Sequence, residues 1–301
     1  MDRARNKRGG LVSAKEEFEP EGGRKRMKEM GGLRRLFSDV FRILGRNFWK
    51  LFAAGGVFSL VVTVVLLPAL VWGRETVVWP MLAFLLCFMD AYVSQIVFGE
   101  LRGESLSIAE ANRRGWRTFL RPLANGICLG LLYYGAALVL ALCFSPELLN
   151  GNLRLAFETK PGVMAVLSVI LFAMEVHASL LLPYTIHTGR YGFPAIFKSI
   201  GIFLRGRYGR NLGHMLLILL CTAAGDLAAI QIFRICQFFS PGGGVLFWLG
   251  ALLAFLAQAT VVLPFSIAAR SLAYQNAGRD AGCKAVLPAE EASQDNAIEI
   301  E

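Results

Sequence analysis

The sequence predicts an all-α fold, a polytopic transmembrane bundle of six spanning helices with amphipathic interfacial helices beside it. Of the 301 residues, 55% are hydrophobic and 18% are charged, whereas a soluble domain carries about a quarter charged residues. Six apolar blocks are each long enough to cross a bilayer. Lysine and arginine gather in alternate connections between these blocks, as they do in multi-pass membrane proteins.

The length of each apolar block sets the number of spans. A helix of about 20 residues, rising about 1.5 Å per residue, covers a hydrocarbon core of roughly 30 Å. The predicted spans are residues 51–73, 78–101, 122–144, 162–187, 213–238 and 244–269.

The distribution of basic residues predicts the orientation. Fourteen lysines and arginines precede residue 51, five lie in 102–121, five in 190–210 and three from residue 270 onward. The three connections on the other side hold only three. Because basic residues near helix ends stay on the cytoplasmic side, both termini are expected in the cytoplasm.

The composition of the ends separates them from the membrane domain. Residues 1–30 carry nine basic and six acidic residues, a composition that cannot bury a core and predicts a disordered cytoplasmic tail. The membrane domain is expected over 31–275, followed by an acidic cytoplasmic tail over 276–301. No signal peptide is expected before the first span.

Three inner segments have the pattern of amphipathic helices at the membrane surface. These are 33–50, 107–120 and 193–208, each with an apolar stripe opposite basic residues. Ser107 and Glu110 have capping-box spacing, and Pro194 suits a first helical turn. The partners expected for these helices are membrane lipids, chiefly anionic, and other membrane proteins, and nucleic acid is not expected. The predicted headgroup contacts are Arg34, Arg35, Arg42, Arg46, Arg113, Arg114, Arg117, Arg205, Arg207 and Arg210.

The order of these segments suggests a threefold internal repeat, in which one surface helix precedes two spans. Spans four and six end in similar Leu-Pro motifs, Leu182-Pro183 and Leu263-Pro264, but span two has none. A proline there is expected to kink its helix. The alternative is that unrelated helical hairpins are joined by amphipathic linkers.

The helix pattern also resembles a known family. The surface helix FSDVFRILGRNFWKLF before the first span, the basic linkers before the third and fifth, and the proline in the last span carry the resemblance. Together, over about 33–275, they resemble bacterial YciC-like and glycerophosphodiester-phosphodiesterase membrane-domain-like proteins. The resemblance implies a six-helix protein of the bacterial inner membrane, in a group mostly of unknown function whose members are sometimes fused to a lipid-headgroup enzyme. No such enzyme domain is expected in this sequence.

Ionisable side chains within the predicted spans are the candidate functional residues. Each costs about 2.5–3.5 kcal/mol at the centre of a spanning helix, so each requires a reason. One interpretation is a polar core that passes a proton, an ion or a headgroup. The other is structural, with one acid paired to Arg234, another acid protonated, and amides joining helices. The candidate intramembrane site is Asp90, Glu175, Asp226, Arg234 and Gln258.

No recognised catalytic or metal-binding motif accompanies these residues. The sequence has no HExxH, GxSxG or GxxxxGK[ST] motif and no CxxC pair. No cofactor and no metal are therefore expected. Gly126 and Gly130 form a GxxxG motif, and Ala223-Ala224-Gly225 is a small-residue patch. Both are expected to mark close helix packing within the bundle, or less readily between two copies.

These observations favour a non-enzymatic multi-pass protein of the inner membrane that organises lipids or partner membrane proteins. The alternative is a proton- or ion-coupled transporter that uses the mid-membrane carboxylates. A lipid-modifying enzyme ranks last because no nucleophile can be recognised.

Overall fold

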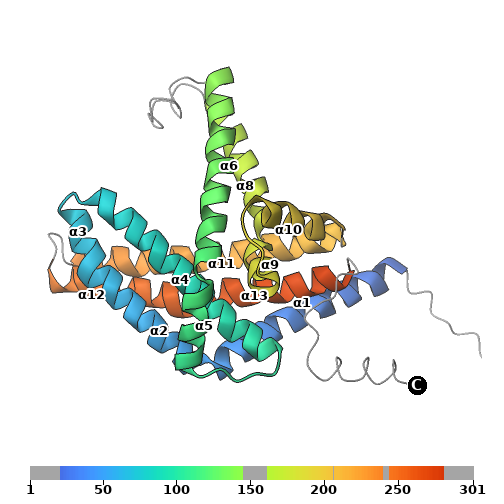
Figure 1. Cartoon of the computed structure of the whole chain (residues 1–301), viewed down its shortest axis with the longest axis horizontal. Coiled ribbons are helices and arrows are strands. Elements are labelled where there is room, and N and C mark those ends of the chain that lie inside the picture. Colours follow the sequence, from blue (N-terminus) through green and yellow to red (C-terminus); the bar gives the residue numbers. More distant parts are fainter. Residues whose placement is uncertain (1–20, 145–160, 206, 240–243, 281–301) are drawn as a thin grey trace, which may run out of the picture. The chain divides into compact units, whose positions relative to one another are not determined.

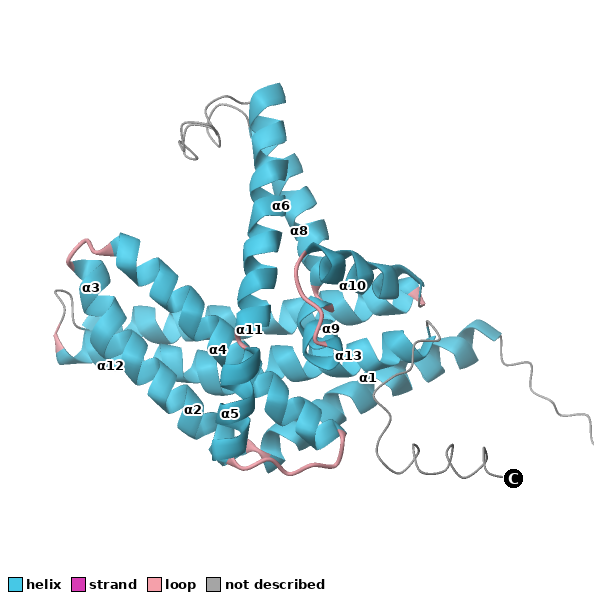
Figure 2. Cartoon of the chain, in the orientation of Figure 1, coloured by secondary structure: helices cyan, strands magenta, loops and turns pink. Residues whose placement is uncertain are grey.

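The computed structural model describes residues 21–144, 161–205, 207–239 and 244–280, and every element in these ranges is helical (Figures 1 and 2). Six helical stretches are long and apolar enough to span a membrane. They are Phe48–Ala69, Thr76–Leu101, Leu120–Val139, Pro161–Thr188, Tyr208–Phe239 and Val245–Gly278. The chain is therefore an all-α, multi-pass membrane protein, as predicted, and each stretch overlaps one predicted span.

The chain divides into two units, Met1–Arg35 and Leu36–Glu301. Helix α1, Glu21–Arg46, begins within the first unit, inside the segment 1–30 that was expected to be disordered. Residues 1–20 and 281–301, which hold most of the two predicted tails, lie outside the described residues.

The second unit is a succession of helices that follows the predicted order (Figure 1). The elements after α1 are α2 (Phe48–Val61), η1 (Val62–Leu66), α3 (Leu67–Val71), α4 (Glu75–Leu101), α5 (Ile108–Thr118), α6 (Leu120–Phe144), α8 (Pro161–Ala178), α9 (Leu181–Thr188), α10 (Phe193–Arg205), α11 (Tyr208–Phe239), α12 (Val245–Ala257), η3 (Gln258–Val262) and α13 (Leu263–Asp280). The last spanning stretch continues well past the predicted end at residue 269, because α13 runs on to Asp280.

The starts of the surface helices follow the predicted local signals. The Ser107 hydroxyl accepts a hydrogen bond from the Glu110 backbone N–H at 3.2 Å, so Ser107 is the N-cap of α5. Pro194 lies in the first turn of α10, where its missing N–H leaves no hydrogen bond unmade. Both predicted helix starts are confirmed.

Three spans are interrupted just before a Leu-Pro pair. The ring of a proline clashes with the carbonyl of the residue four positions earlier in a regular α-helix. Here that earlier residue always lies in an irregular segment, which is the π-helical η1, the break between α8 and α9, or the π-helical η3. The residue pairs are Val64 with Pro68, Ser179 with Pro183, and Thr260 with Pro264. The predicted irregularities in spans four and six are confirmed, and the one in span one was missed.

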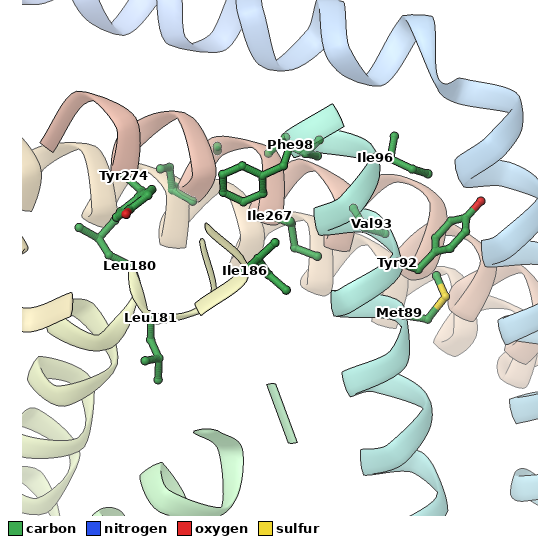
Figure 3. Close-up of a cluster of buried hydrophobic side chains, with 14 of the residues drawn as sticks. Met89, Tyr92, Val93, Ile96, Phe98, Leu180, Leu181, Ile186, Ile267 and Tyr274 are labelled. Carbon is green, nitrogen blue, oxygen red and sulfur yellow. The ribbon is translucent and has the colours of Figure 1, made fainter. Parts of the chain in front are cut away.

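The apolar core draws on both ends of the second unit. Side chains of α4, among them Phe98, belong to the same buried cluster as Ile267 and Tyr274 of α13 (Figure 3). Leu36, Val40 and Ile43 of α1 are buried in the same cluster. The apolar stripe predicted for the first surface helix therefore contacts the rest of the protein along much of its length, rather than lipid alone.

Glycines allow two helices to approach η3 from different sides. A Cβ atom on Gly55 of α2 would overlap the Thr260 side chain and would lie 3.1 Å from the Ala259 carbonyl carbon. A Cβ atom on Gly225 of α11 would lie 2.8 Å from a Val262 methyl group. The small-residue patch around Gly225 thus marks close packing within the bundle, as predicted.

The GxxxG motif of α6 does not pack in this way. No heavy atom lies within 4 Å of a Cβ atom placed on Gly126 or Gly130, among the described residues. The expectation that this motif marks close packing inside the bundle is therefore wrong. Helix α6 pairs with α8 instead, through a small separate cluster around Met164 and Leu167, and Figure 1 shows the pair steeply inclined to α11 and α13.

Candidate functional site

A polar cavity of about 130 Å³ lies within the spanning region. It is formed by α4, α6, α8, α9 and α13, which are distant in sequence. The lining residues are Asp90, Pro122, Asn125, Gly126, Leu129, Glu175, Ala178, Ser179, Leu181, Leu182 and Arg270. The cavity thus brings together Asp90 and Glu175, two of the predicted site residues, and adds Arg270, which sequence reasoning placed among the cytoplasmic flanking residues.

Glu175 is held by contacts from two other helices. One carboxylate oxygen, Oε2, accepts a hydrogen bond from the Tyr133 hydroxyl of α6 at 2.9 Å. The other, Oε1, lies 3.6 Å from Nη2 of Arg270 on α13. A separation of 3.6 Å is an ion pair, but it is long for a hydrogen bond. Glu175 therefore links α8 to α6 firmly and to α13 more loosely.

Asp90 lines the same cavity without a direct partner. Within the described residues, its carboxylate makes no hydrogen bond and no salt bridge. The adjacent Met89 is buried in the apolar core, which fixes this turn of α4 in the bundle. The Asp90 carboxylate thus faces a space that also contains one guanidinium group.

Asn125 forms a fixed wall of the cavity. Its amide donates to the Thr185 hydroxyl at 2.7 Å, and its oxygen accepts from the Gly192 backbone N–H at 2.8 Å. Gly192 has φ +76°, a conformation that favours glycine. These bonds join α6 to α9 and to the connection before α10, so the Asn125 side chain holds these segments together.

Asp226 and Gln258 form a separate polar pair. The Gln258 amide donates to the Asp226 carboxylate at 2.6 Å, which joins α11 to η3. The two residues line a second cavity of about 360 Å³ whose other lining residues are all apolar. The structure thus divides the predicted site into two places, with Asp90 and Glu175 in one and Asp226 and Gln258 in the other.

Arg234 joins neither place. Its side chain is exposed on α11, five residues before that helix ends, and within the described residues no partner is found for it. The sequence suggested Arg234 as the cation that pairs with an acid inside the bundle. In the structure, the cation that pairs with Glu175 is Arg270 instead. A signal was available in the sequence, because Arg270 directly follows an apolar block of 26 residues, longer than a span requires.

The arginines predicted to contact headgroups fall into two groups. Several are already paired with carboxylates: Arg42 with Asp39 at 3.0 Å, Arg46 with Glu100 at 2.9 Å, Arg113 with Glu110 at 2.7 Å, and Arg114 with Glu110 at 2.8 Å and Glu104 at 3.0 Å. Arg210 is half-buried and also has an interaction partner. The others are exposed and have no ion pair within the described part of the chain. They are Arg34, Arg35, Arg117, Arg205 and Arg207.

The ion pairs of α5 shift the titration of two surface groups. Hydrogen bonds from Arg114, with a further one from Arg113, lower the pKa of the Glu110 carboxyl. Hydrogen bonds to Glu110 and Glu104 raise the pKa of the Arg114 guanidinium. The carboxylate also lies in the first turn of α5, where the helix dipole favours negative charge.

Glu110 is expected to stabilise the protein only when it is ionised. Because its pKa is lower in the folded state, its contribution is present above about pH 4.3, the unfolded value, and is lost as the pH falls through the lowered value. The melting temperature of Glu110→Gln in mild detergent should therefore lie below that of wild type at pH 7, and the two should converge in acid. A difference that does not shrink as the pH falls would contradict this assignment.

Within the described residues, no group of three or more His, Cys, Asp or Glu side chains is placed to hold a metal ion. No protein-family model, no curated protein and no solved structure matches the chain. The resemblance to six-helix bacterial membrane proteins therefore rests on the helix pattern of the sequence.

Proposed function

We propose that this chain is a non-enzymatic protein of the bacterial inner membrane that organises anionic lipids at the cytoplasmic surface. The observation that carries the proposal is the pairing of exposed apolar side chains with exposed cations on three surface segments. Such pairing is typical of elements that enter the headgroup layer, because the apolar groups enter the acyl region while the cations contact phosphates.

We name these three segments the lipid anchors. Their large apolar side chains include Trp49, Leu120 and Phe197, which are 76%, 62% and 65% exposed. The first anchor is Phe41, Arg42, Arg46 and Trp49, the second is Arg113, Trp116, Arg117 and Leu120, and the third is Phe197, Lys198, Leu204, Arg205 and Arg207.

Chain connectivity supports a common membrane side for the anchors. Each anchor lies next to the start of an odd-numbered span, and two spans separate each anchor from the next. Crossing the membrane twice returns the chain to the side from which it started. The excess of basic residues in the same connections favours the cytoplasmic side. Lipids and neighbouring membrane proteins are the partners that such a surface suits.

The third anchor gives the sharpest test, because no carboxylate of the described residues pairs with its arginines. Each cation near an anionic surface contributes about 1 kcal/mol of attraction. The variant Lys198→Gln/Arg205→Gln/Arg207→Gln is therefore expected to retain anionic lipid at least about tenfold less well than wild type. Purified protein in mild detergent would be titrated with phosphatidylglycerol, and bound lipid would be counted by native mass spectrometry.

Arg74→Gln provides a matched control. Arg74 is exposed beside the exposed Trp72, but it lies between spans one and two, on the other predicted side. The control should retain lipid like wild type, and neutral lipid should distinguish none of the three proteins. Equal retention of phosphatidylglycerol by the triple variant and wild type would overturn the proposal.

A further inference from the structure

The polar cavity contains two carboxylates but one guanidinium group. Nη2 of Arg270 lies 3.6 Å from Oε1 of Glu175, and the buried Nε atom of Arg270 has no hydrogen-bond partner within the described ranges. Asp90 lines the cavity with no direct partner among the described residues. Arg270 therefore has an unused hydrogen-bond donor in the same cavity in which the Asp90 carboxylate accepts no hydrogen bond from the described residues.

We propose that this cavity is a proton-binding site in which Asp90 and Glu175 share Arg270 and Asp90 takes up and releases the proton. One cation can balance one carboxylate at membrane depth, and a second ionised carboxylate would remain uncompensated. Protonation of Asp90 removes that charge. When Asp90 is protonated, Arg270 pairs with Glu175 alone. When Asp90 is ionised, the guanidinium group of Arg270 interacts with both carboxylates.

The proton step is a simple transfer. In uptake, a hydronium ion in the cavity gives one proton to a carboxylate oxygen of Asp90, which leaves a water molecule and a neutral carboxylic acid. Release is the reverse. The cavity volume of about 130 Å³ accommodates several water molecules, since one water occupies roughly 30 Å³ in the liquid.

The surroundings of Asp90 hold Glu175 in place while the proton moves. The Tyr133 hydroxyl fixes one Glu175 oxygen and leaves the other facing Arg270. Cys87 lies one turn before Asp90 on α4, and Arg270 of α13 is the cation that lines the cavity in the described part of the chain. The residues that α9 and the break before it give to the cavity, Ser179, Leu181 and Leu182, carry no charge.

Infrared spectroscopy of the full chain in lipid nanodiscs tests the site directly. A protonated carboxyl group with few hydrogen bonds absorbs at a higher frequency than an exposed one. Lowering the pH should produce such a band in wild type, and Asp90→Asn should lose it. Asp90→Glu should keep a band at a shifted frequency. Transfer to heavy water should shift the wild-type band, because the cavity exchanges protons with water.

Two further variants separate the site from other carboxylates. Asp226→Asn removes a mid-membrane acid that is paired with Gln258, and it should leave the band intact. Arg270→Gln removes the shared cation, so more carboxyl is protonated at neutral pH and the band should be stronger there.

Circular dichroism confirms that each variant remains helical. An unchanged band in folded Asp90→Asn, or no band in wild type at any pH, would overturn the proposal. Neither result depends on whether the anchors bind lipid.

Discussion

Gly55→Leu is expected to lower the free energy of unfolding by about 3 kcal/mol, near the upper end of the usual cost of overpacking a core. The first added atom would overlap the side chain of Thr260 and crowd the backbone of η3 at Ala259. A flexible side chain can move aside, but the backbone of a helix that is also packed against Gly225 on α11 cannot do so cheaply. Denaturation with sodium dodecyl sulfate in mild detergent measures the loss.

Gly56→Leu is the matched control, since no heavy atom of another described segment lies within 4 Å of a Cβ atom at that position. The two glycines are neighbours on α2, so they share helix propensity and membrane depth. Leucine at position 56 should be neutral or mildly stabilising, because glycine is the weaker helix former. Similar losses at both positions would show that α2 does not pack closely against η3 at Gly55.

Arg270→Met is expected to cost about 2–4 kcal/mol, somewhat less than the 3–5 kcal/mol typical of breaking a fully buried ion pair. The expected loss of stability is smaller because the pair is partly exposed to solvent: the side chains of Arg270 and Glu175 are 21% and 42% exposed. Methionine preserves much of the volume, so the loss reports the missing charge. Of its contacts with described residues, Glu175 would then keep the hydrogen bond from Tyr133.

A double variant distinguishes a missing charge from poor packing. Arg270→Met/Glu175→Gln removes both members of the pair, and it should recover more than half of the loss. Arg234→Met, at an exposed arginine of α11, should change stability by no more than about 0.5 kcal/mol. Additive losses in the double variant would show that Arg270 and Glu175 do not interact.

Sequence reasoning located the spans because their signal is local. Apolar length alone decides whether a helix can cross the hydrocarbon core, and all six predicted spans coincide with long helices in the structure. The start of α5 at Ser107 was also predictable, since an N-cap depends on two residues three positions apart. No long-range information is needed for either feature.

The polar cavity depends on long-range packing and was found only in part. Asp90 and Glu175 stood out because charges are costly within a span. Their partner did not, since Arg270 follows the apolar block and was counted with the flanking cations. Only the packing of α13 against α4 and α9 brings it to the carboxylates. No described helix packs closely against Gly126. This too could not be predicted from the sequence, because it depends on how steeply α6 crosses the other helices.

The π-helical segment η3 also determines the direction of side chains beyond it. A π-helical turn contains one residue more than an α-helical turn. This extra residue rotates the side chains that follow by about 100° around the helix axis, since an α-helix has about 3.6 residues per turn. Arg270 lies eight residues after η3. In a regular helix of the same sequence, its guanidinium would point about a quarter of a turn away from Glu175. The electrostatic balance of the cavity thus depends on the angular phase of α13, which a backbone irregularity and the proline at position 264 set together.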